Sequence, residues 1–508
     1  MSIFNSCHES WLKTKDQAEG YSRDQLRSWL MKEGYLPEPA LLPPCFKSNE
    51  LKIDKTYNTK IPGNASDLAT ISLPKSELAT RTYAVIHPRK YEYLVFLICR
   101  NWEVIREILF HEDNSIYSYS FPIPITSGNS PSSDSHDKRP DHFIYDWTKM
   151  AEEDLVIEAQ KYAYVAKTDI SNFYPSIYTH SIQWAFKDAA NQEDIGGLID
   201  EAVRLGQTKR SNSLPIGPST SDIIAEIILS SIDIQSSKDI KSRALDVIIT
   251  RFKDDYRILA NDIDTAKECL SIISINLNKY HLHLNENKTE ITNTPSGLFR
   301  EHISEYKKTT RGIFKKNKIK HRDFFHILND VFEIQKKFPA QSILNKFLNS
   351  IFTKKEKTLK IRLPKNEEKR TKFIRKFLSM LIIGTRISPK HIGTILGTIE
   401  QLKILQILSK DELKEYIKEP LLKRLERSLT LNEEMVSIWI LYFASAQSLD
   451  ANDFKALAAA SSSKSKFLTA MSSSSSKKPK LFPAIEESFM INSKKAAKTS
   501  ILKYLDLS

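Results

Sequence analysis

The chain has 508 residues and a mass of 58.4 kDa, more than one ordinary hydrophobic core holds, so we expect two or more domains. Its 41% hydrophobic and 27% charged residues are typical of a water-soluble globular protein, and no apolar run reaches the roughly 20 residues of a membrane span. The first thirty residues do not resemble a secretory signal, which predicts a cytoplasmic protein. The four cysteines are widely spaced and support neither a disulfide framework nor a zinc site, so reduced thiols are expected.

The net charge of +13 is unevenly distributed along the chain. Residues 1–300 hold 34 Lys and Arg against 41 Asp and Glu, a net −7, whereas residues 301–508 hold 41 against 21, a net +20. Because a concentrated positive field attracts phosphates, the C-terminal part is expected to bind a polyanion. The alternative is a merely solvated basic face.

The N-terminal part combines helical and irregular segments. Residues 11–33 have helical spacing, and the proline-rich stretch at residues 35–46 should end that helix. Residues 127–141 are dense in Ser, Pro and charge, which predicts an exposed loop, and Lys138 and Arg139 within it are candidate phosphate ligands.

Strand-like and helix-like segments alternate between residues 162 and 291. Residues 164–170 are predicted as a strand, residues 219–232 as a helix, and residues 247–259 as two short strands around a tight turn. This order predicts an α+β sheet domain.

Beyond residue 300 the pattern becomes helical. We expect domains at 1–300 and 301–508, the second basic, all-helical and solenoid-like, although no fixed repeat length is present. A low-complexity Ser/Lys tract at residues 461–480 is predicted as a loop or linker. The predicted helices beyond residue 300 cover residues 326–338, 372–387, 391–409, 410–429 and 432–447.

Three aspartates are candidates for metal-dependent nucleotidyl transfer. That reaction uses two divalent cations about 4 Å apart, so carboxylates must converge from separate elements. Asp169 ends an apolar strand, and Asp254 and Asp255 lie at the tip of the predicted hairpin. Taken singly, an Asp after a strand or an Asp–Asp pair is usually turn chemistry.

The order of the surrounding segments strengthens this interpretation. A Gly-Pro turn leads directly into a helix between the two acidic sites, and a further segment after the hairpin supplies the isolated Lys288. This ordered set resembles the fingers and palm of reverse transcriptases over roughly residues 80–300. The matching segments are motif A at Asp169–Tyr174, motif B at Leu214–Pro218, motif C at Phe252–Asp255 and motif D at Leu284–Ile291.

The resemblance implies a DNA polymerase whose substrates are dNTPs. It makes Asp169 and Asp254 the principal ligands of two Mg²⁺ ions, with Mn²⁺ as a substitute, and Asp255 a third carboxylate ligand. The backbone N–H groups of Asn172 and Phe173 would bind the triphosphate.

Three further residues receive roles from the same resemblance. Tyr174 would lie beneath the sugar and exclude a 2′-hydroxyl, although an ordinary core aromatic is the alternative. Gly217 would let the backbone approach the nucleotide closely. Lys288 would stand near the leaving pyrophosphate as a positive charge or a proton donor, with an ordinary surface lysine as the alternative.

Two positions depart from template-copying members of the family. Ile216 stands where a Gln is usual in motif B, and Lys253 precedes the paired acids, where it would contact a nucleic-acid phosphate. With the long helical C-terminus, these departures resemble the abortive-infection branch of the reverse-transcriptase family. That resemblance implies a bacterial, prophage-borne phage-defence enzyme, a homo-oligomer that makes single-stranded DNA without a template, primed by and covalently attached to a protein hydroxyl.

Other interpretations remain. Any of 19 tyrosines could prime, with Tyr21 and Tyr35 the first guesses. A conventional RNA-templated reverse transcriptase is one alternative function, which Ile216 disfavours. A non-catalytic nucleic-acid-binding scaffold is another, which the three retained acids disfavour, because buried like charges are costly without metal.

Overall fold

The structure is a computed structural model, and it divides into two compact units. The first unit holds Met1–Leu36, Glu50–Leu68 and Ala84–Phe299, and the second holds Pro37–Asn49, Ala69–Tyr83 and Arg300–Ser508. Lys138, Arg139 and most of the predicted loop around them lie outside the described residues, as do residues 462–464 and 474–480 of the Ser/Lys tract. The tract is not a loop throughout, because its residues Lys466–Ser472 form a helix. The residues described are 5–37, 41–46, 63–74, 80–123, 140–313, 318–353, 357–461, 465–473, 481–482 and 500–505.

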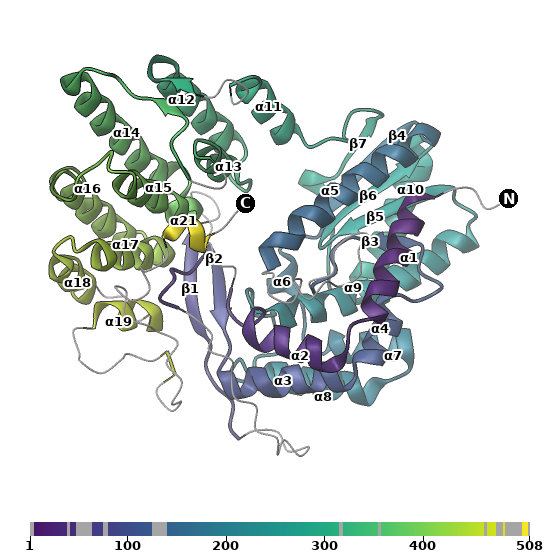
Figure 1. The fold of residues 1–508 in the computed structure, drawn as a ribbon. Coiled ribbons are helices and arrows are strands. Elements are labelled where there is room, and N and C mark those ends of the chain that lie inside the picture. The colour runs from purple at the N-terminus through teal and green to yellow at the C-terminus, as the bar shows by residue number, and fades with distance from the viewer. Residues whose placement is uncertain are drawn as a thin grey trace. The chain divides into compact units, whose positions relative to one another are not determined.

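A five-stranded sheet in the order β3-β5-β6-β4-β7 forms the centre of the first unit (Figure 1). β3 pairs parallel with β5, and the remaining neighbours are antiparallel. The predicted mixture of helices and strands is therefore confirmed for this part of the chain. The strands are β3 (Ile116–Ser118), β4 (Tyr164–Asp169), β5 (Val247–Phe252), β6 (Asp255–Ala260) and β7 (Glu290–Asn293).

Both faces of this sheet are covered at its centre. The consecutive residues Ile258, Leu259 and Ala260 of β6 are fully buried, although neighbouring side chains on a strand point to opposite faces. Val165 and Ala166 of β4 are buried in the same way. This explains why the strands are continuous apolar runs in the sequence instead of alternating ones.

Helices surround the sheet in the first unit. The long α9 is buried around most of its circumference, as its run of isoleucines predicts, and α10 packs on both α9 and the sheet. The helices of this unit are α1 (Ser6–Glu19), α2 (Arg23–Lys32), α3 (Pro88–Arg100), α4 (Trp102–Leu109), α5 (Pro140–Glu158), α6 (Phe173–Ser176), α7 (Ser181–Ala190), α8 (Glu193–Leu205), α9 (Ser219–Ser242) and α10 (Ile263–Lys279), with short 3₁₀ turns η2 (Ala159–Lys161) and η3 (Glu286–Lys288).

The opening helical segment is two helices instead of one. α1 ends at Gly20, and α2 begins after Ser22, whose side chain and that of Gln25 form a capping box. The reciprocal hydrogen bonds of that box define a new helix start. The spacing of apolar residues alone did not reveal this break.

The second unit consists mostly of helices. α15 lies at its centre, since Glu400 on that helix accepts hydrogen bonds from the side chain of Gln447 and from the backbone of Ile501. A solenoid is not confirmed by this arrangement. The helices are α11 (Glu301–Thr310), α12 (His321–Lys337), α13 (Ile343–Ser350), α14 (Glu367–Ile387), α15 (Ile392–Ile404), α16 (Lys410–Thr430), α17 (Glu434–Gln447), α18 (Ala451–Ala459), α19 (Lys466–Ser472) and α21 (Ile501–Tyr504), with a 3₁₀ turn η4 (Pro389–His391).

Two small sheets also occur, and neither was predicted. β1 (Ala69–Pro74) pairs with β2 (Thr80–Val85), and β8 (Ile319–Lys320) pairs with β9 (Ile361–Arg362). The part of the chain beyond residue 300 therefore contains a short two-stranded sheet as well as helices. Its two-residue strands are too short to produce a visible alternation in the sequence.

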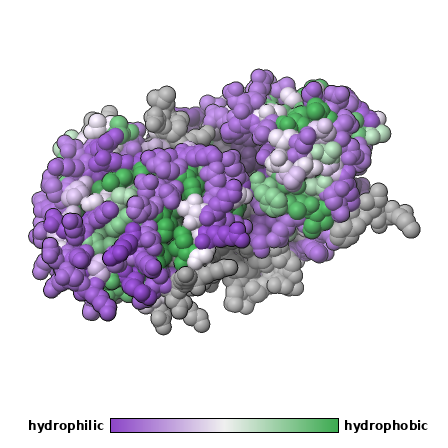
Figure 2. Space-filling view, turned by 90° about the horizontal axis from the view of Figure 1, so that it is seen from above, coloured by the Kyte–Doolittle hydropathy of each residue, from purple (hydrophilic) through white to green (hydrophobic). Residues whose placement is uncertain are grey.

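The surface is mixed in character. Viewed from above, hydrophilic side chains cover much of each unit, with hydrophobic residues visible between them (Figure 2). Among the described residues, no helix is long and apolar enough to cross a membrane.

Two adjacent glycines in α8 allow a matched test of packing. A Cβ on Gly196 would lie 2.7 Å from the Cα of Gln183, whereas the nearest atom to one on Gly197 is 3.8 Å away. We expect Gly196→Ala to lower the free energy of unfolding by about 1–3 kcal/mol, because helices α7 and α8 must separate. Gly197→Ala should raise it by roughly 0.5–1 kcal/mol, because alanine restricts the unfolded chain. Urea denaturation of both variants measures the difference, and equal stabilities would contradict the packing.

Candidate functional site

The sheet brings the three predicted aspartates together at one end. Asp169, the last residue of β4, is the direct cross-strand partner of Asp255, the first residue of β6. Asp254 precedes it in the hairpin turn, and its carbonyl oxygen accepts a hydrogen bond from the N–H of Ile170 at 3.1 Å. Side chains of directly opposed residues lie about 5 Å apart at Cβ, so the separate strands place the carboxylates side by side.

The turn between β5 and β6 has an unusual backbone conformation. Phe252 pairs with Asp255, so the loop consists of only Lys253 and Asp254. Lys253 has a φ of 53°, a left-handed conformation that costs a residue with a Cβ about 1–2 kcal/mol. A compensating interaction must therefore hold the turn in place.

Arg251 provides that interaction. Its guanidinium is completely buried, and Nη1 donates a hydrogen bond of 3.2 Å to the carbonyl oxygen of Lys253. The same group donates to both carboxylate oxygens of Glu226 at 2.8 and 2.9 Å and to Asp233 at 2.7 Å. Burial opposes the charge, but the two carboxylates outweigh it and raise the pKa of Arg251 well above its ordinary value.

The carboxylates of this network have further donors. The hydroxyl of Ser120 donates to Glu226 at 2.7 Å, and that of Tyr256 donates to Asp233 at 2.9 Å. Every charged group of the network therefore has a partner, which is the condition under which buried charges are tolerated. The network attaches the hairpin to α9.

A row of acids on α9 faces the hairpin, and the sequence analysis missed it. Asp222, Glu226 and Asp233 recur at intervals of four and seven residues, which places them on one side of a helix. Arg251 pairs with the last two, and Lys253 pairs with Asp222 at 3.5 Å. The spacing was visible in the sequence, but an acid row usually indicates a solvated face.

Lys288 approaches the aspartates from a separate segment. Its ammonium group forms a hydrogen-bonded ion pair with Oδ2 of Asp169, which raises the pKa of Lys288. The N–H of Asn285 donates to the carbonyl oxygen of Asp169 at 2.8 Å, and the hydroxyls of Thr168 and Thr289 lie 2.7 Å apart. The structure thus brings the predicted lysine to the predicted acids.

The motif A residues after Asp169 turn sharply away from the sheet. Asn172 has a φ of 48° and begins the short helix α6, in which Phe173 is buried. The hydroxyl of Tyr174 donates a hydrogen bond to Asp222. Burial and then the charge of Asp222 raise the pKa of Tyr174, and Asp254 makes a smaller contribution in the same direction. The ring of Tyr174 therefore lies at the same end of the sheet as Asp254.

Gly217 lies in a backbone conformation that favours glycine. Its φ is 129°, and it directly precedes Pro218, the N-cap of α9. The N–H of Ser219 donates to the carbonyl oxygen of Gly34 at 2.8 Å. The carbonyl oxygen of Ile216 accepts from the N–H of Ala84 at 2.8 Å, so the turn before α9 is fixed on both sides.

Divalent cations fit the carboxylates chemically. Oδ1 of Asp169 is buried and lacks a hydrogen-bond partner among the described residues, which leaves one carboxylate oxygen available to a ligand. Among the same residues, however, no group of three His, Cys, Asp or Glu side chains is arranged as a finished metal site. The ammonium of Lys288 instead pairs with Asp169, so metal binding requires side-chain rearrangement.

Burial and the repulsion between neighbouring carboxylates raise the pKa values of Asp254 and Asp255. Burial and then the charge of Asp169 raise the pKa of Asp254. The pKa of Asp255 is raised to about 6, first because the protein packed around its carboxylate reduces its hydration and then because Asp254 and Asp169 are negatively charged. Part of the residue nevertheless remains exposed to solvent. Lys288 offsets only part of the charge of these three carboxylates, and an excess of negative charge of this kind is typical of cation sites.

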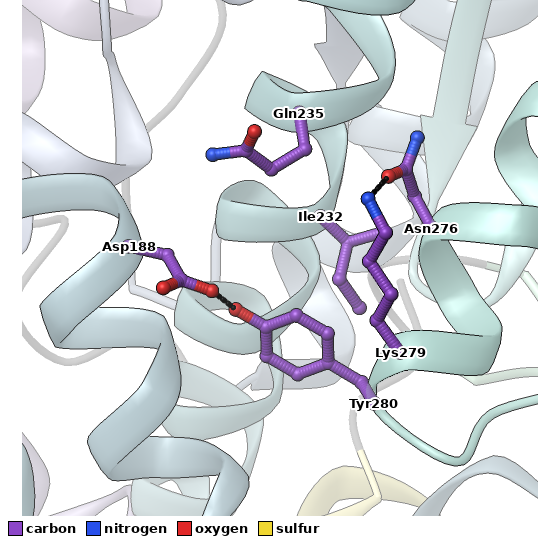
Figure 3. Close-up of a pocket in the computed structure, with 6 residues that line it drawn as sticks. All are labelled: Asp188, Ile232, Gln235, Asn276, Lys279 and Tyr280. Carbon is purple, nitrogen blue, oxygen red and sulfur yellow. Dashed lines mark hydrogen bonds between the residues drawn. The ribbon is translucent and has the colours of Figure 1, made fainter.

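A separate cavity of about 180 Å³ lies between α7, α9 and α10 (Figure 3). Tyr280 donates a hydrogen bond of 2.8 Å to Asp188 across it, and Lys279 donates to Asn276 at 2.8 Å. None of the predicted site residues lines this cavity.

Comparison with known protein families identifies this part of the chain. Residues 124–328 match the family model described as reverse transcriptase (RNA-dependent DNA polymerase). A reverse-transcriptase domain is therefore present, which indicates a polymerase of the nucleotidyltransferase type. The match covers α9, the segment with Lys288 and four strands of the sheet (β4, β5, β6 and β7), whereas β3 precedes it. No curated protein matches the chain in sequence.

Similar solved structures include yeast telomerases. The apo telomerase of Candida tropicalis is 13% identical with a TM-score of 0.33, covering 78% of this chain and 68% of that chain. A form of it truncated from the C-terminal domain is 14% identical with a TM-score of 0.32, covering 47% and 52%. Telomerase of Candida albicans, in complex with a fragment of telomeric RNA, is 14% identical with a TM-score of 0.31, covering 75% and 66%. This chain spans about half to two thirds of those chains.

Removing Arg251 should be strongly destabilising. Arg251→Met leaves Glu226 and Asp233 buried without a cation, and we expect the free energy of unfolding to fall by about 3–5 kcal/mol at pH 7.5. Without its cation, the buried Asp233 should have a folded-state pKa even higher than its value of about 6 in the parent, so the loss should shrink as the pH falls toward 6 and this acid protonates. The matched control is Arg243→Met, which removes an exposed pair with Glu268 and should cost less than about 1 kcal/mol. Similar losses for both variants in urea denaturation would contradict the buried network.

The raised pKa of Asp255 predicts a pH-dependent gain in stability. Its charged form is disfavoured in the folded protein above about pH 6, and this penalty disappears as the pH falls toward the unfolded value near 4. Asp255→Asn should therefore raise the melting temperature of metal-free protein at pH 7.5 and have little effect at pH 4.5. A gain that is equal at both pH values would show that the disfavoured charge of Asp255 is not its cause.

Proposed function

We propose that the chain is a DNA polymerase of the reverse-transcriptase type that joins dNTPs by two-metal nucleotidyl transfer. One observation carries this proposal: Asp169 is paired directly with Asp255 across β4 and β6, with Asp254 beside them in the turn. The three acids lie within the segment that matches the reverse-transcriptase model.

Each acid has a proposed part in the reaction. Asp169 and Asp254 would hold two Mg²⁺ ions, or Mn²⁺ in their place, with Asp255 as a further carboxylate. Bound there, such cations activate the attacking hydroxyl and neutralise charge on the triphosphate. The unpartnered Oδ1 of Asp169 supports this assignment.

The remaining residues would bind and orient the nucleotide. Lys288, already beside Asp169, would place its ammonium group near the leaving pyrophosphate and supply positive charge or a proton. Asn172 and Phe173 would offer backbone N–H groups to the triphosphate, and Gly217 would admit the nucleotide close to the backbone. The ring of Tyr174 would lie under the sugar and favour deoxynucleotides.

A finer proposal concerns how synthesis begins. The apolar Ile216 in the wall beside Gly217 supports synthesis without a template, because it offers no side-chain hydrogen bond to a template base. By resemblance to the abortive-infection branch, we further propose priming by a protein hydroxyl, a homo-oligomeric enzyme and a role in bacterial defence against phage. Lys253, near the acids, would contact the phosphate of the growing single-stranded DNA.

The two tyrosines first guessed as primers are poor candidates. Tyr35 is fully buried, and its hydroxyl donates a hydrogen bond of 2.6 Å to the carbonyl oxygen of Ile86. Tyr21 is also buried, and burial raises its pKa. A priming hydroxyl must reach the acids, so neither tyrosine can serve while it stays packed in the first unit.

Asp254→Asn is the direct test of the metal assignment. Purified protein with dNTPs and Mg²⁺, and no added nucleic acid, should acquire a protease-sensitive DNA ladder on a denaturing gel. We expect the substitution to reduce incorporation by about 10²–10³-fold, the magnitude typical for loss of one electrostatic catalytic group. Salt-sensitive DNA binding should remain, because the amide is nearly the same size and the basic second unit is unchanged.

Other outcomes separate the competing functions. Copying of a primed RNA template, with no product in its absence, would replace the untemplated proposal by a conventional reverse transcriptase. DNA binding without incorporation under either condition would indicate a non-catalytic scaffold. An Asp254→Asn variant as active as the parent would remove the metal assignment. Mass spectrometry of the protein as expressed would locate any peptide that carries nucleotides.

A further inference from the structure

Asp222 links three elements that meet beside the acids. Its Oδ1 accepts a hydrogen bond from the hydroxyl of Tyr174, on the short helix α6. Its Oδ2 lies 3.5 Å from Nζ of Lys253, in the turn between β5 and β6. Asp222 itself is in the first turn of α9. One carboxylate therefore fixes a side chain from motif A to the turn that carries motif C.

Asp222 differs from the other two acids in its row. Glu226 and Asp233 are buried and are satisfied by Arg251, so they brace the hairpin. The side chain of Asp222 is 27% exposed, and its cationic partner Lys253 is 30% exposed. An ion pair this open contributes little to stability. The Asp222–Lys253 pair is therefore not needed to hold the hairpin on α9, because the buried ion pairs of Arg251 already do so.

The hydrogen bond from Tyr174 determines where the ring lies. A tyrosine ring anchored only by packing can move about its χ1 and χ2 torsions, whereas a charge-assisted bond at the hydroxyl fixes the far end. Lys253 neutralises much of the carboxylate's charge, which reduces its repulsion of a polyanionic substrate.

We propose that Asp222 is a specificity-determining positioning residue, which holds the ring of Tyr174 in place so that it excludes nucleotides with a 2′-hydroxyl. The inference rests on the proposed function, since it requires that the chain incorporate nucleotides. It assigns the sugar discrimination to the pair Tyr174–Asp222 and not to the tyrosine ring alone. Asp222 acts through Tyr174 and does not contact the reacting atoms.

The test is the ratio of kcat/KM for dNTP to that for the matching rNTP, measured for three variants. Asp222→Ala should lower this ratio about tenfold, which corresponds to about 1.4 kcal/mol of lost discrimination. Tyr174→Phe keeps the ring and loses the same bond, so it should have the same effect. The double variant should be no less selective than either single one, because both remove one shared interaction.

Two more variants separate positioning from general damage. Asp222→Asn keeps an oxygen that accepts from Tyr174 but loses the ion pair with Lys253, so it should retain most of the parent's selectivity. The matched control is Asp188→Ala, which removes another Tyr–Asp hydrogen bond, that of Tyr280 in the cavity of Figure 3. It should leave the ratio unchanged. Melting temperatures of all variants show whether each one is folded.

The outcomes distinguish this inference from the proposed function. A parent protein that incorporates no nucleotide at all would overturn the proposed function. An active parent whose Asp222→Ala variant loses activity equally for dNTP and rNTP would overturn the positioning role. So would additive effects of Asp222→Ala and Tyr174→Phe. If Asp222→Ala fails to fold, the comparison of Asp222→Asn with Tyr174→Phe still decides, because only the second should lose selectivity.

Discussion

The geometry at the acidic end of the sheet depends on one buried cation. Arg251 is sealed from solvent, bonded to two carboxylates on α9 and to the backbone of the turn that it precedes. Without it, the left-handed Lys253 would lose the hydrogen bond to its carbonyl oxygen, and two acids would be buried in a low-dielectric interior without their cation. The network therefore fixes the position and the orientation of the β5–β6 hairpin relative to α9. Because the acids at 254 and 255 belong to that hairpin, their position relative to β4 follows from this buried charge cluster.

The same region contains two opposed kinds of electrostatics. Between the hairpin and α9, the buried Arg251 is paired with Glu226 and Asp233, which is a stable arrangement. At the tip of the hairpin, three carboxylates lie close to one partly exposed lysine, and the pKa values of Asp254 and Asp255 are raised by burial and by the neighbouring negative charges. Strain of this type is typical of sites that complete themselves with a ligand. The buried Arg251 network holds the hairpin in the position that keeps Asp254 and Asp255 close to Asp169 despite their repulsion.

Much of the central domain could be predicted from sequence. The strand ending at Asp169, the hairpin around Asp254 and the helix after Gly217 lie where the pattern of apolar runs and turn residues placed them. Their convergence could not be derived from spacing, because sheet order depends on long-range pairing; it came from a resemblance to a known family. Asp222 and Arg251 were missed for a physical reason. Charged residues normally face water, so nothing local in the sequence distinguishes an acid row that is matched by a buried arginine on a strand distant in the chain.

The strand pair near the N-terminus has a consequence for how the chain must be made. β1 belongs to the second unit, where Ser72 bonds through its N–H to Glu434 at 2.9 Å and through its hydroxyl to the backbone of Asn432 at 2.6 Å. More than 350 residues separate these partners in sequence. During translation at about 5–20 residues per second, β1 must wait tens of seconds for α17 to leave the ribosome. The second unit therefore cannot be completed until its C-terminal helices have been made, and no single proteolytic cut could release that unit whole.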